Sequence, residues 1–181
     1  MALPLATGTW NIDKSHSAVE FSVRHLGLTN VRGRFDTFDG AIVVGDTLAD
    51  TKVNAVIQLG SINTNSADRD AHLKGTDFFG VETHTDMTFE STGIDGSGDE
   101  YKLHGNLTMR GITKPITLDV EFGGVEASPF DKTPRAGFSA EGSVSRKDYG
   151  IDFNVPLGGD KLLVGDKIKI NLELELLAPA L

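Results

Sequence analysis

Five histidines are the residues best suited to acid–base or metal chemistry in this chain, and they stand at positions 16, 25, 72, 84 and 104. None forms the HExxH spacing of a helical zinc site, and a mixed His/Cys site is excluded because the chain has no cysteine. His16, His25 and a carboxylate could still meet in space. We expect no metal site, since a lone histidine is more often a hydrogen-bonded structural residue.

Patterns for covalent or phosphate chemistry are absent from the sequence. It contains no GxSxG turn, no P-loop and no dinucleotide fingerprint. Asp36 with Asp39, and Asp68 with Asp70, lie in polar segments where carboxylates are usually solvated or cap turns. The residues favour a protein that binds over one that catalyses. An isomerase or hydrolase that uses His16 or His25, with or without a metal, is the alternative.

The segment from Asp68 to Leu73 is the densest in groups that could hold an anion. Arg69 and His72 stand three residues apart and would be neighbours on a helix. Together they could bind the anionic head group of a ligand at the mouth of a barrel. The alternative is that Arg69 pairs with a local acid on the surface.

The framework that positions the histidines and charged residues named above is built from β-strands, which the sequence marks as short runs of alternating apolar and polar residues. Side chains on a β-strand point to opposite faces with a period of two. Val19, Phe21 and Val23 therefore share one face, and His25 continues it. We expect His25 to point inward and to need a hydrogen-bond partner there, unless the strand ends at Arg24 and the ring turns to solvent.

Seven further runs show strand patterning, at residues 40–44, 53–59, 87–91, 103–109, 116–122, 136–144 and 168–176. The total of about eight strands is the range in which a small barrel closes. The segment from Ser61 to Gly80 breaks the pattern, and Ser66 is expected to cap a short helix that continues through Lys74 and ends at Gly75. We expect one all-β domain over residues 9–178, with residues 1–8 as an N-terminal extension.

The apolar faces of these strands need a partner, and one short helix cannot cover them. A closed barrel and a two-sheet sandwich are the two solutions. Small residues on the inward faces, such as Gly105 and Ala140, either leave room for a ligand or serve the taper of a barrel. The residues expected to line the pocket by their inward parity are Val19, Phe21, Val23, His25, Ile57, Leu59, Phe89, Leu107 and Phe138.

Composition excludes several partners. The net charge of -9 argues against nucleic acid, and the 17 Lys and Arg are scattered along the sequence, which disfavours electrostatic docking on anionic membranes. No run reaches the ~18 apolar residues of a membrane span. The start of the chain shows no secretory signal, so we expect a cytoplasmic protein, or a periplasmic or secreted one if a leader was removed. A homodimer, and a scaffold without ligand, stay open.

Longer stretches carry a family resemblance. They are Trp10 to Leu26, Gly33 to Gly40, Ser61 to Thr64 with Arg69 to Leu73 and Asp77 to Phe79, Gly105 to Pro115, and Ser145 to Gly150. In this order, from about Thr9 to Leu177, the sequence resembles the YceI-like family. The resemblance implies an all-β fold, a single eight-stranded antiparallel lipocalin-like barrel with one short helical segment between strands. It also implies a bound polyisoprenoid lipid, of the quinone or polyprenyl phosphate type, with its tail inside. Members typically carry a secretion signal and work in the bacterial periplasm or outside the cell. We therefore hypothesise non-enzymatic lipid binding with no other cofactor.

Overall fold

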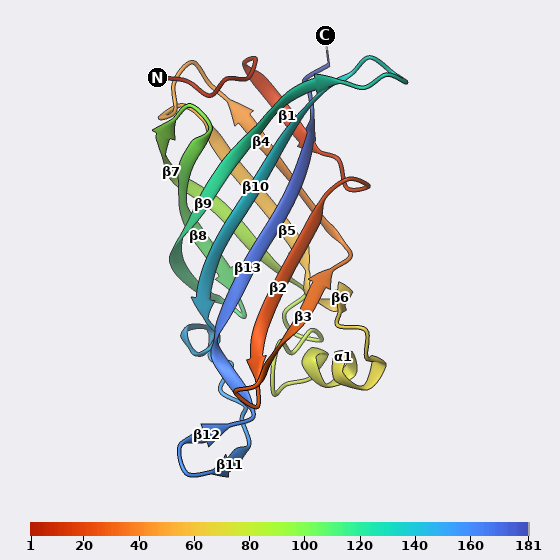
Figure 1. The fold of residues 1–181 in the computed structure, drawn as a ribbon, viewed down its shortest axis with the longest axis vertical. Coiled ribbons are helices and arrows are strands. Elements are labelled where there is room, and N and C mark those ends of the chain that lie inside the picture. The colour runs from red at the N-terminus through yellow and green to blue at the C-terminus, as the bar shows by residue number, and fades with distance from the viewer. Residues whose placement is uncertain (181) are drawn as a thin grey trace.

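A computed structural model describes residues 1–180, and antiparallel strands dominate it (Figure 1). The strands of the main sheet are β1 (Gly8–Ile12), β2 (Ala18–His25), β3 (Thr29–Phe35), β4 (Phe38–Val44), β5 (Lys52–Gln58), β6 (Ile62–Asn63), β7 (Asp86–Ser97), β8 (Glu100–Met109), β9 (Ile112–Ala127), β10 (Pro134–Ser145) and β13 (Val164–Leu177). A separate hairpin joins β11 (Pro156–Gly158) and β12 (Lys161–Leu162), and the helical segments are η1 (Leu59–Ser61), α1 (Ala67–Lys74) and η2 (Arg146–Tyr149).

The last strand, β13, closes the sheet into a barrel. It pairs with β10 along one edge, and with both β1 and β2 along the other. Because β1 pairs with β4 while β2 pairs with β3, β1 and β2 share one strand position and β3 and β4 share the next. The closed circuit runs β1-β4-β5-β7-β8-β9-β10-β13, which confirms the predicted antiparallel, lipocalin-like barrel of eight strands.

Alternation along each strand sends one set of side chains inward, and glycines make room for the largest of them. A Cβ atom on Gly105 would lie 2.2 Å from the ring of Phe89, and one on Gly33 would lie 2.3 Å from the ring of Phe21. Each aromatic ring thus lies over a neighbouring strand where that strand has no side chain. The interior is shaped by these glycine–aromatic pairs as well as by apolar residues.

A cluster of buried side chains closes the upper end, where both termini lie in Figure 1. Trp10 is buried there, and its indole N–H donates to the carbonyl of Ala6 at 2.9 Å. Leu3, from the segment expected to be an extension, packs into the same cluster and borders the cavity below it. The first residues of the chain therefore contribute to the upper cover of the barrel.

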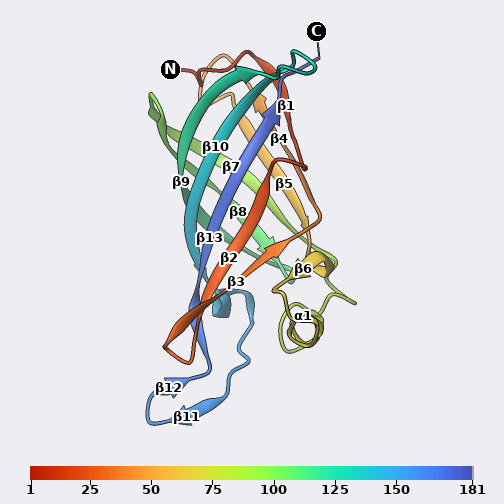
Figure 2. The ribbon, with the colours of Figure 1, turned by 45° about the vertical axis from the view of Figure 1, so that its right-hand side comes forward.

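Irregular segments cover the lower end, as Figures 1 and 2 show. The predicted helix is confirmed, because the Ser66 side chain accepts a hydrogen bond from the Arg69 amide and α1 ends at Lys74 before Gly75. The chain after α1 brings Phe78 and Phe79 against the barrel. Two tips project further down, namely the turn between β2 and β3 and the β11–β12 hairpin (Figure 2). No helix within residues 1–180 is long and apolar enough to cross a membrane.

Candidate functional site

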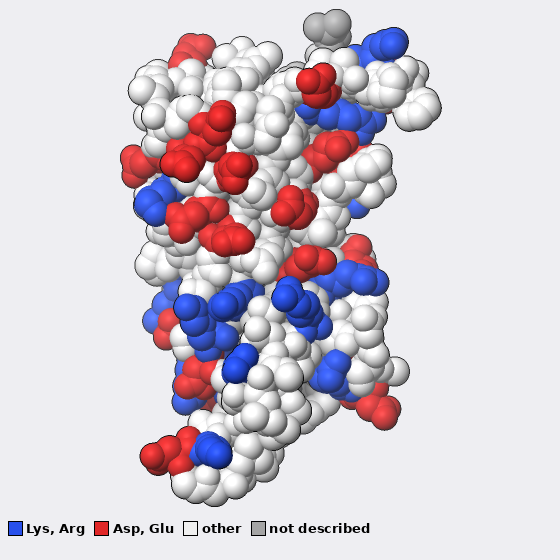
Figure 3. Space-filling view, viewed as in Figure 1, with Lys and Arg blue, Asp and Glu red and all other residues white. Residues whose placement is uncertain are grey.

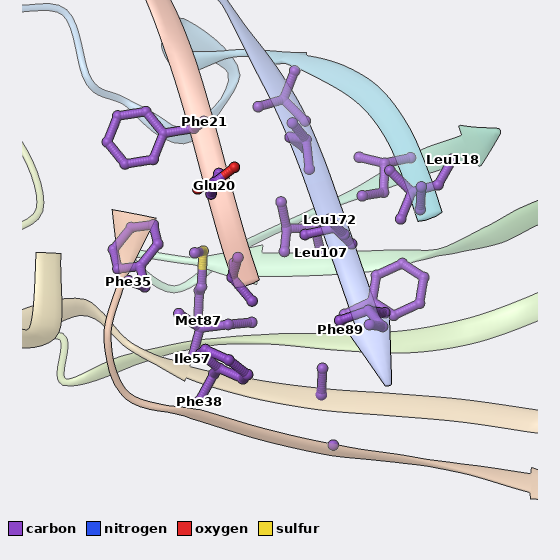
Figure 4. A pocket seen from close by; sticks show the side chains of 18 of the residues that line it. Glu20, Phe21, Phe35, Phe38, Ile57, Met87, Phe89, Leu107, Leu118 and Leu172 are labelled. Carbon is purple, nitrogen blue, oxygen red and sulfur yellow. The ribbon is translucent and has the colours of Figure 1, made fainter. Parts of the chain in front are cut away.

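The barrel encloses a cavity of about 290 Å³ whose lining is almost entirely apolar (Figure 4). Along β13 the lining extends from Val164 at the lower end to Leu176 at the upper end. With a rise of about 3.3 Å per residue and a strand tilt of about 40°, this stretch corresponds to roughly 30 Å along the barrel axis. The cavity is therefore long and narrow, and it suits an extended apolar chain.

Most of the residues predicted from strand parity line this cavity. They are Val19, Phe21, Val23, Ile57, Phe89, Leu107 and Phe138. Leu59 is the first exception. It is fully buried, but it lies in η1 and packs with Phe35 and Ile62 in the lower core, outside the lining. Parity does not apply to it, because the strand ends at Gln58.

The placement of His25 in the cavity is wrong. His25 is the last residue of β2, where it pairs with Thr29 and Val164, and it is half-buried outside the lining. The pairing of β2 with β13 shifts in register between Val164 and Ile168. The extra residues lie on β13, while β2 pairs regularly with β3 as far as His25 and Thr29. His25 therefore keeps the parity of Val23, but it lies at the lower rim of the barrel, where the strand ends, and not in the lining.

Strand β13 contributes a large part of the lining that was not among the predicted site residues. The side chains of Ile168, Ile170, Leu172, Leu174 and Leu176 all border the cavity. Their alternation with polar residues was the clearest strand signal in the chain, so parity could have assigned them. Leu73, Phe78 and Phe79 also border the cavity from α1 and the segment that follows it. No periodic pattern marks these three residues.

The two head-group candidates already have partners within the chain. Arg69 donates from Nε to the Thr64 hydroxyl at 2.8 Å and from Nη2 to the Thr64 carbonyl at 2.7 Å. His72 places Nε2 2.9 Å from a carboxylate oxygen of Asp77, and its ring packs edge-on against Phe78. Neither candidate lines the cavity. Arg69 and His72 instead hold the segments on either side of α1.

A different arginine reaches the lower end of the cavity. Arg146 is only 3% exposed and directs all five of its N–H groups at acceptors in the segments that cover this end. The acceptors are the carbonyls of Gly165 (2.9 Å), Ile151 (2.8 Å), Phe153 (2.8 Å) and Val164 (3.4 Å), and the carboxylate of Asp166 (3.3 Å). Its hydrogen bonds hold the lower cover together, and no N–H remains for a ligand.

His16 lies in a polar cluster outside the cavity. One ligand atom each from His16, Asp13 and Glu175 lies within 4.8 Å of the others. Arg135 already binds both carboxylates, with distances of 2.5 Å to Asp13 and 3.0 Å to Glu175. Hydrogen bonds from Ser15 and His16, with a further one from Arg135, hold the pKa of Asp13 far below its usual value. The cluster thus has its own cation, and His25 is not part of it.

Burial also perturbs one phenol near η2. The Tyr149 side chain is 1% exposed, and desolvation raises its pKa to about 12, with a smaller contribution from the charge of Asp148. It packs among apolar residues such as Met109 and Ile151. Tyr149 therefore stays neutral and acts as part of the core at the lower end.

A closed antiparallel barrel of eight strands around an apolar cavity defines the class, which is that of the lipocalin-like binding proteins. Within that class the chain belongs to the YceI-like family, because the family model of the YceI-like domain matches residues 10–176.

Relatives and solved structures agree with this assignment. A UPF0312 protein of Staphylococcus aureus (strain N315) is 39% identical over 168 residues, which cover 92% of this chain and 95% of that protein. A UPF0312 protein of Yersinia pestis (strain Pestoides F) is 42% identical over 145 residues, or 78% of this chain and 75% of that protein. The crystal structure of the Campylobacter jejuni YCEI protein is 31% identical, with a TM-score of 0.72 over 87% of this chain and 90% of that one. A polyisoprenoid binding domain from Saccharophagus degradans shares the fold, with 17% identity and a TM-score of 0.65 over 94% of this chain and 98% of that one.

Proposed function

We propose that this protein binds and carries a long isoprenoid lipid, of the quinone or polyprenyl phosphate type, with its tail inside the barrel. The observation that carries the proposal is the long, narrow and almost entirely apolar cavity. Burial of an apolar chain is favourable by about 0.8 kcal/mol per methylene, so a long tail needs few polar contacts. The polyisoprenoid binding domain with the same fold supports the same choice of ligand.

The polar residues around the barrel indicate that the tail supplies most of the affinity. All five N–H groups of Arg146 are hydrogen-bonded within the protein, and Arg69 and His72 also have partners within the chain. A head group would therefore lie outside the apolar lining and meet α1 only if these pairs rearranged. The proposed role is carriage without chemical conversion, since none of the five histidines borders the cavity.

Filling the cavity should remove the bound lipid. Ala140 is buried on β10 and borders the cavity, whereas its neighbour Glu141 is exposed on the outer face. We expect Ala140→Phe to purify with little lipid and Glu141→Phe to keep the wild-type amount, as measured by solvent extraction and mass spectrometry. Circular dichroism checks that both variants are folded. Equal lipid content in a folded Ala140→Phe variant would contradict the cavity as the binding site.

A further inference from the structure

The outer face of the barrel separates its charges into rows of opposite sign. Strand register places Lys169 of β13 beside Ser22 of β2, which in turn pairs with Arg32 of β3. Lys167 and Arg24 lie in the next outward positions toward the lower end. All four basic side chains are exposed, and within residues 1–180 none has a carboxylate within 4.0 Å. They form a basic belt across β13, β2 and β3 on one face of the lower barrel.

The rows above the basic belt are acidic. One step up, Glu20 pairs with Asn171, which pairs with Glu141, and Glu141 pairs with Asp119. Figure 3 shows a cluster of acidic residues over the upper part of this face and a cluster of basic residues below it, with single residues of the other sign around each. The basic belt is thus a positively charged area on a chain whose net charge is -9. It cannot be recognised in the linear sequence, because its residues come from three strands.

Exposed leucines project below this basic belt. Leu28 is 71% exposed in the turn between β2 and β3, and Leu157 and Leu162 are exposed in the β11–β12 hairpin. The two tips lie side by side, because the Leu26 amide donates to the Leu163 carbonyl at 2.9 Å. Asp160 and Lys161 stand next to each other at the hairpin end, so they add no net charge there. Apolar tips below a basic belt match the interface of an anionic bilayer.

The upper end does not offer this combination. Phe130 is 96% exposed there, but in the turn between β9 and β10 it is followed by Asp131 and Lys132, which add no net charge, and Glu126 lies near the end of β9. The cavity also favours the lower end, where Arg146, Ile151 and Val164 border it directly above the two tips. A surface that held the tips would therefore face the irregular lower cover of the cavity.

We propose that the lower end docks on the surface of a bilayer that contains anionic lipids. The leucines of the two tips insert among the lipids, and the basic belt faces the head groups. Each Lys or Arg near such a surface strengthens binding about fivefold at low salt. A role for this docking in lipid uptake rests on the proposed carrier function, but docking itself can be measured without a bound ligand.

Sedimentation with vesicles tests the proposal. We expect binding to vesicles of equal parts phosphatidylcholine and phosphatidylglycerol, weak binding to pure phosphatidylcholine, and loss of binding at high salt. The double variant Lys167→Gln/Lys169→Gln should weaken binding by about fivefold or more, while Lys52→Gln/Lys132→Gln, with the same loss of charge elsewhere, should change it less than about twofold.

A second pair of variants tests the leucine tips. Leu28→Ser/Leu157→Ser should weaken binding about tenfold or more, whereas Phe130→Ser at the opposite end should leave it unchanged. Absence of binding by the wild type, or equal effects of the lower-end and control variants, would overturn the docking surface. Mass spectrometry of lipid in the same preparations separates the two proposals. Wild-type lipid without vesicle binding rejects docking alone, and vesicle binding without any lipid rejects the carrier function alone.

Discussion

Arg146 shows how a single buried cation can organise one end of the barrel. Its sequence context, at the end of a strand and next to Lys147, indicates only a strand terminus. Two of its five acceptors lie five and seven residues away and the other three lie 18 to 20 residues away, at the start of β13, so no periodic pattern identifies them. Removal of the guanidinium takes this donor from the carbonyls of Gly165, Ile151 and Phe153, whereas the Val164 carbonyl keeps a hydrogen bond from Asn154 at 2.8 Å.

Arg146→Met should therefore lower the free energy of unfolding by about 3 kcal/mol or more, because several buried acceptors lose their hydrogen bonds together. The neighbouring Lys147→Met, at an exposed position, should change it by less than about 0.5 kcal/mol. Chemical denaturation of both variants measures the difference. Similar stabilities for the two would mean that the lower cover does not depend on Arg146.

Parity within a strand predicted most of the cavity lining, and it failed where a strand ends. Val19, Phe21 and Val23 line the cavity as expected, while His25, the last residue of β2, lies at the rim outside the lining. The head-group candidates show a related limit. Arg69 finds its acceptor on Thr64, and composition gives no sign that a guanidinium will prefer a nearby backbone carbonyl.

At the level of single elements, sequence patterns predicted those elements whose ends are set by neighbouring residues. Helix α1 has the predicted bounds because its capping residues adjoin it in the sequence. Strand β1 was not predicted as a strand, because its pairing partners, β4 and β13, come from other parts of the chain. The tight contact of Gly105 with Phe89 on the next strand depends on the register between β7 and β8, which no sequence pattern predicted.

Gly105→Ala should destabilise the barrel by about 1–3 kcal/mol, because the new methyl group would overlap the Phe89 ring and the Glu90 carbonyl at 2.7 Å. Gly137 on β10 is the matched control, since a Cβ there meets no atom within 4 Å. Gly137→Ala should be neutral or slightly stabilising. Thermal and urea denaturation would contradict the packing argument if the two substitutions had equal effects.

At the scale of the whole molecule, the fold class could be predicted but the distribution of charge could not. Eight alternating runs without covering helices require a closed or two-layered sheet. The placement of Lys169 beside Ser22 and Arg32 requires the strand order, which only the closed barrel defines. The scattered cations of the linear sequence become the basic belt, so the expectation that charge disfavours anionic membranes is not supported by their arrangement in space.

The seam where the barrel closes is stabilised by charge, and this makes the stability of the whole molecule depend on pH. Asp13 lies in the turn between β1 and β2 and binds Arg135 of β10, which also binds Glu175 of β13. A carboxyl with a lowered folded-state pKa stabilises the fold above its unfolded pKa of about 3.9 and loses this contribution as the pH falls through the folded value.

Asp13→Asn should therefore be less stable than the wild type at neutral pH by about 1–3 kcal/mol, with the gap narrowing as the pH falls below about 4. Urea denaturation at a series of pH values measures both curves. Parallel curves over the acidic range would show that Asp13 does not couple the seam to protonation.

Closure by β13 also determines when the molecule can fold. The partners of β1 at the seam are Leu176 and Leu177, at the opposite end of the chain from Asn11 and Ile12. A nascent chain that has not yet reached Val164 is an open sheet with two unpaired edges and an exposed apolar face, which is the form most prone to edge-to-edge aggregation. Contacts of such long sequence separation give slow folding, on the order of milliseconds to seconds. Synthesis of β13, the last strand of the barrel, therefore converts an aggregation-prone open sheet into a closed barrel.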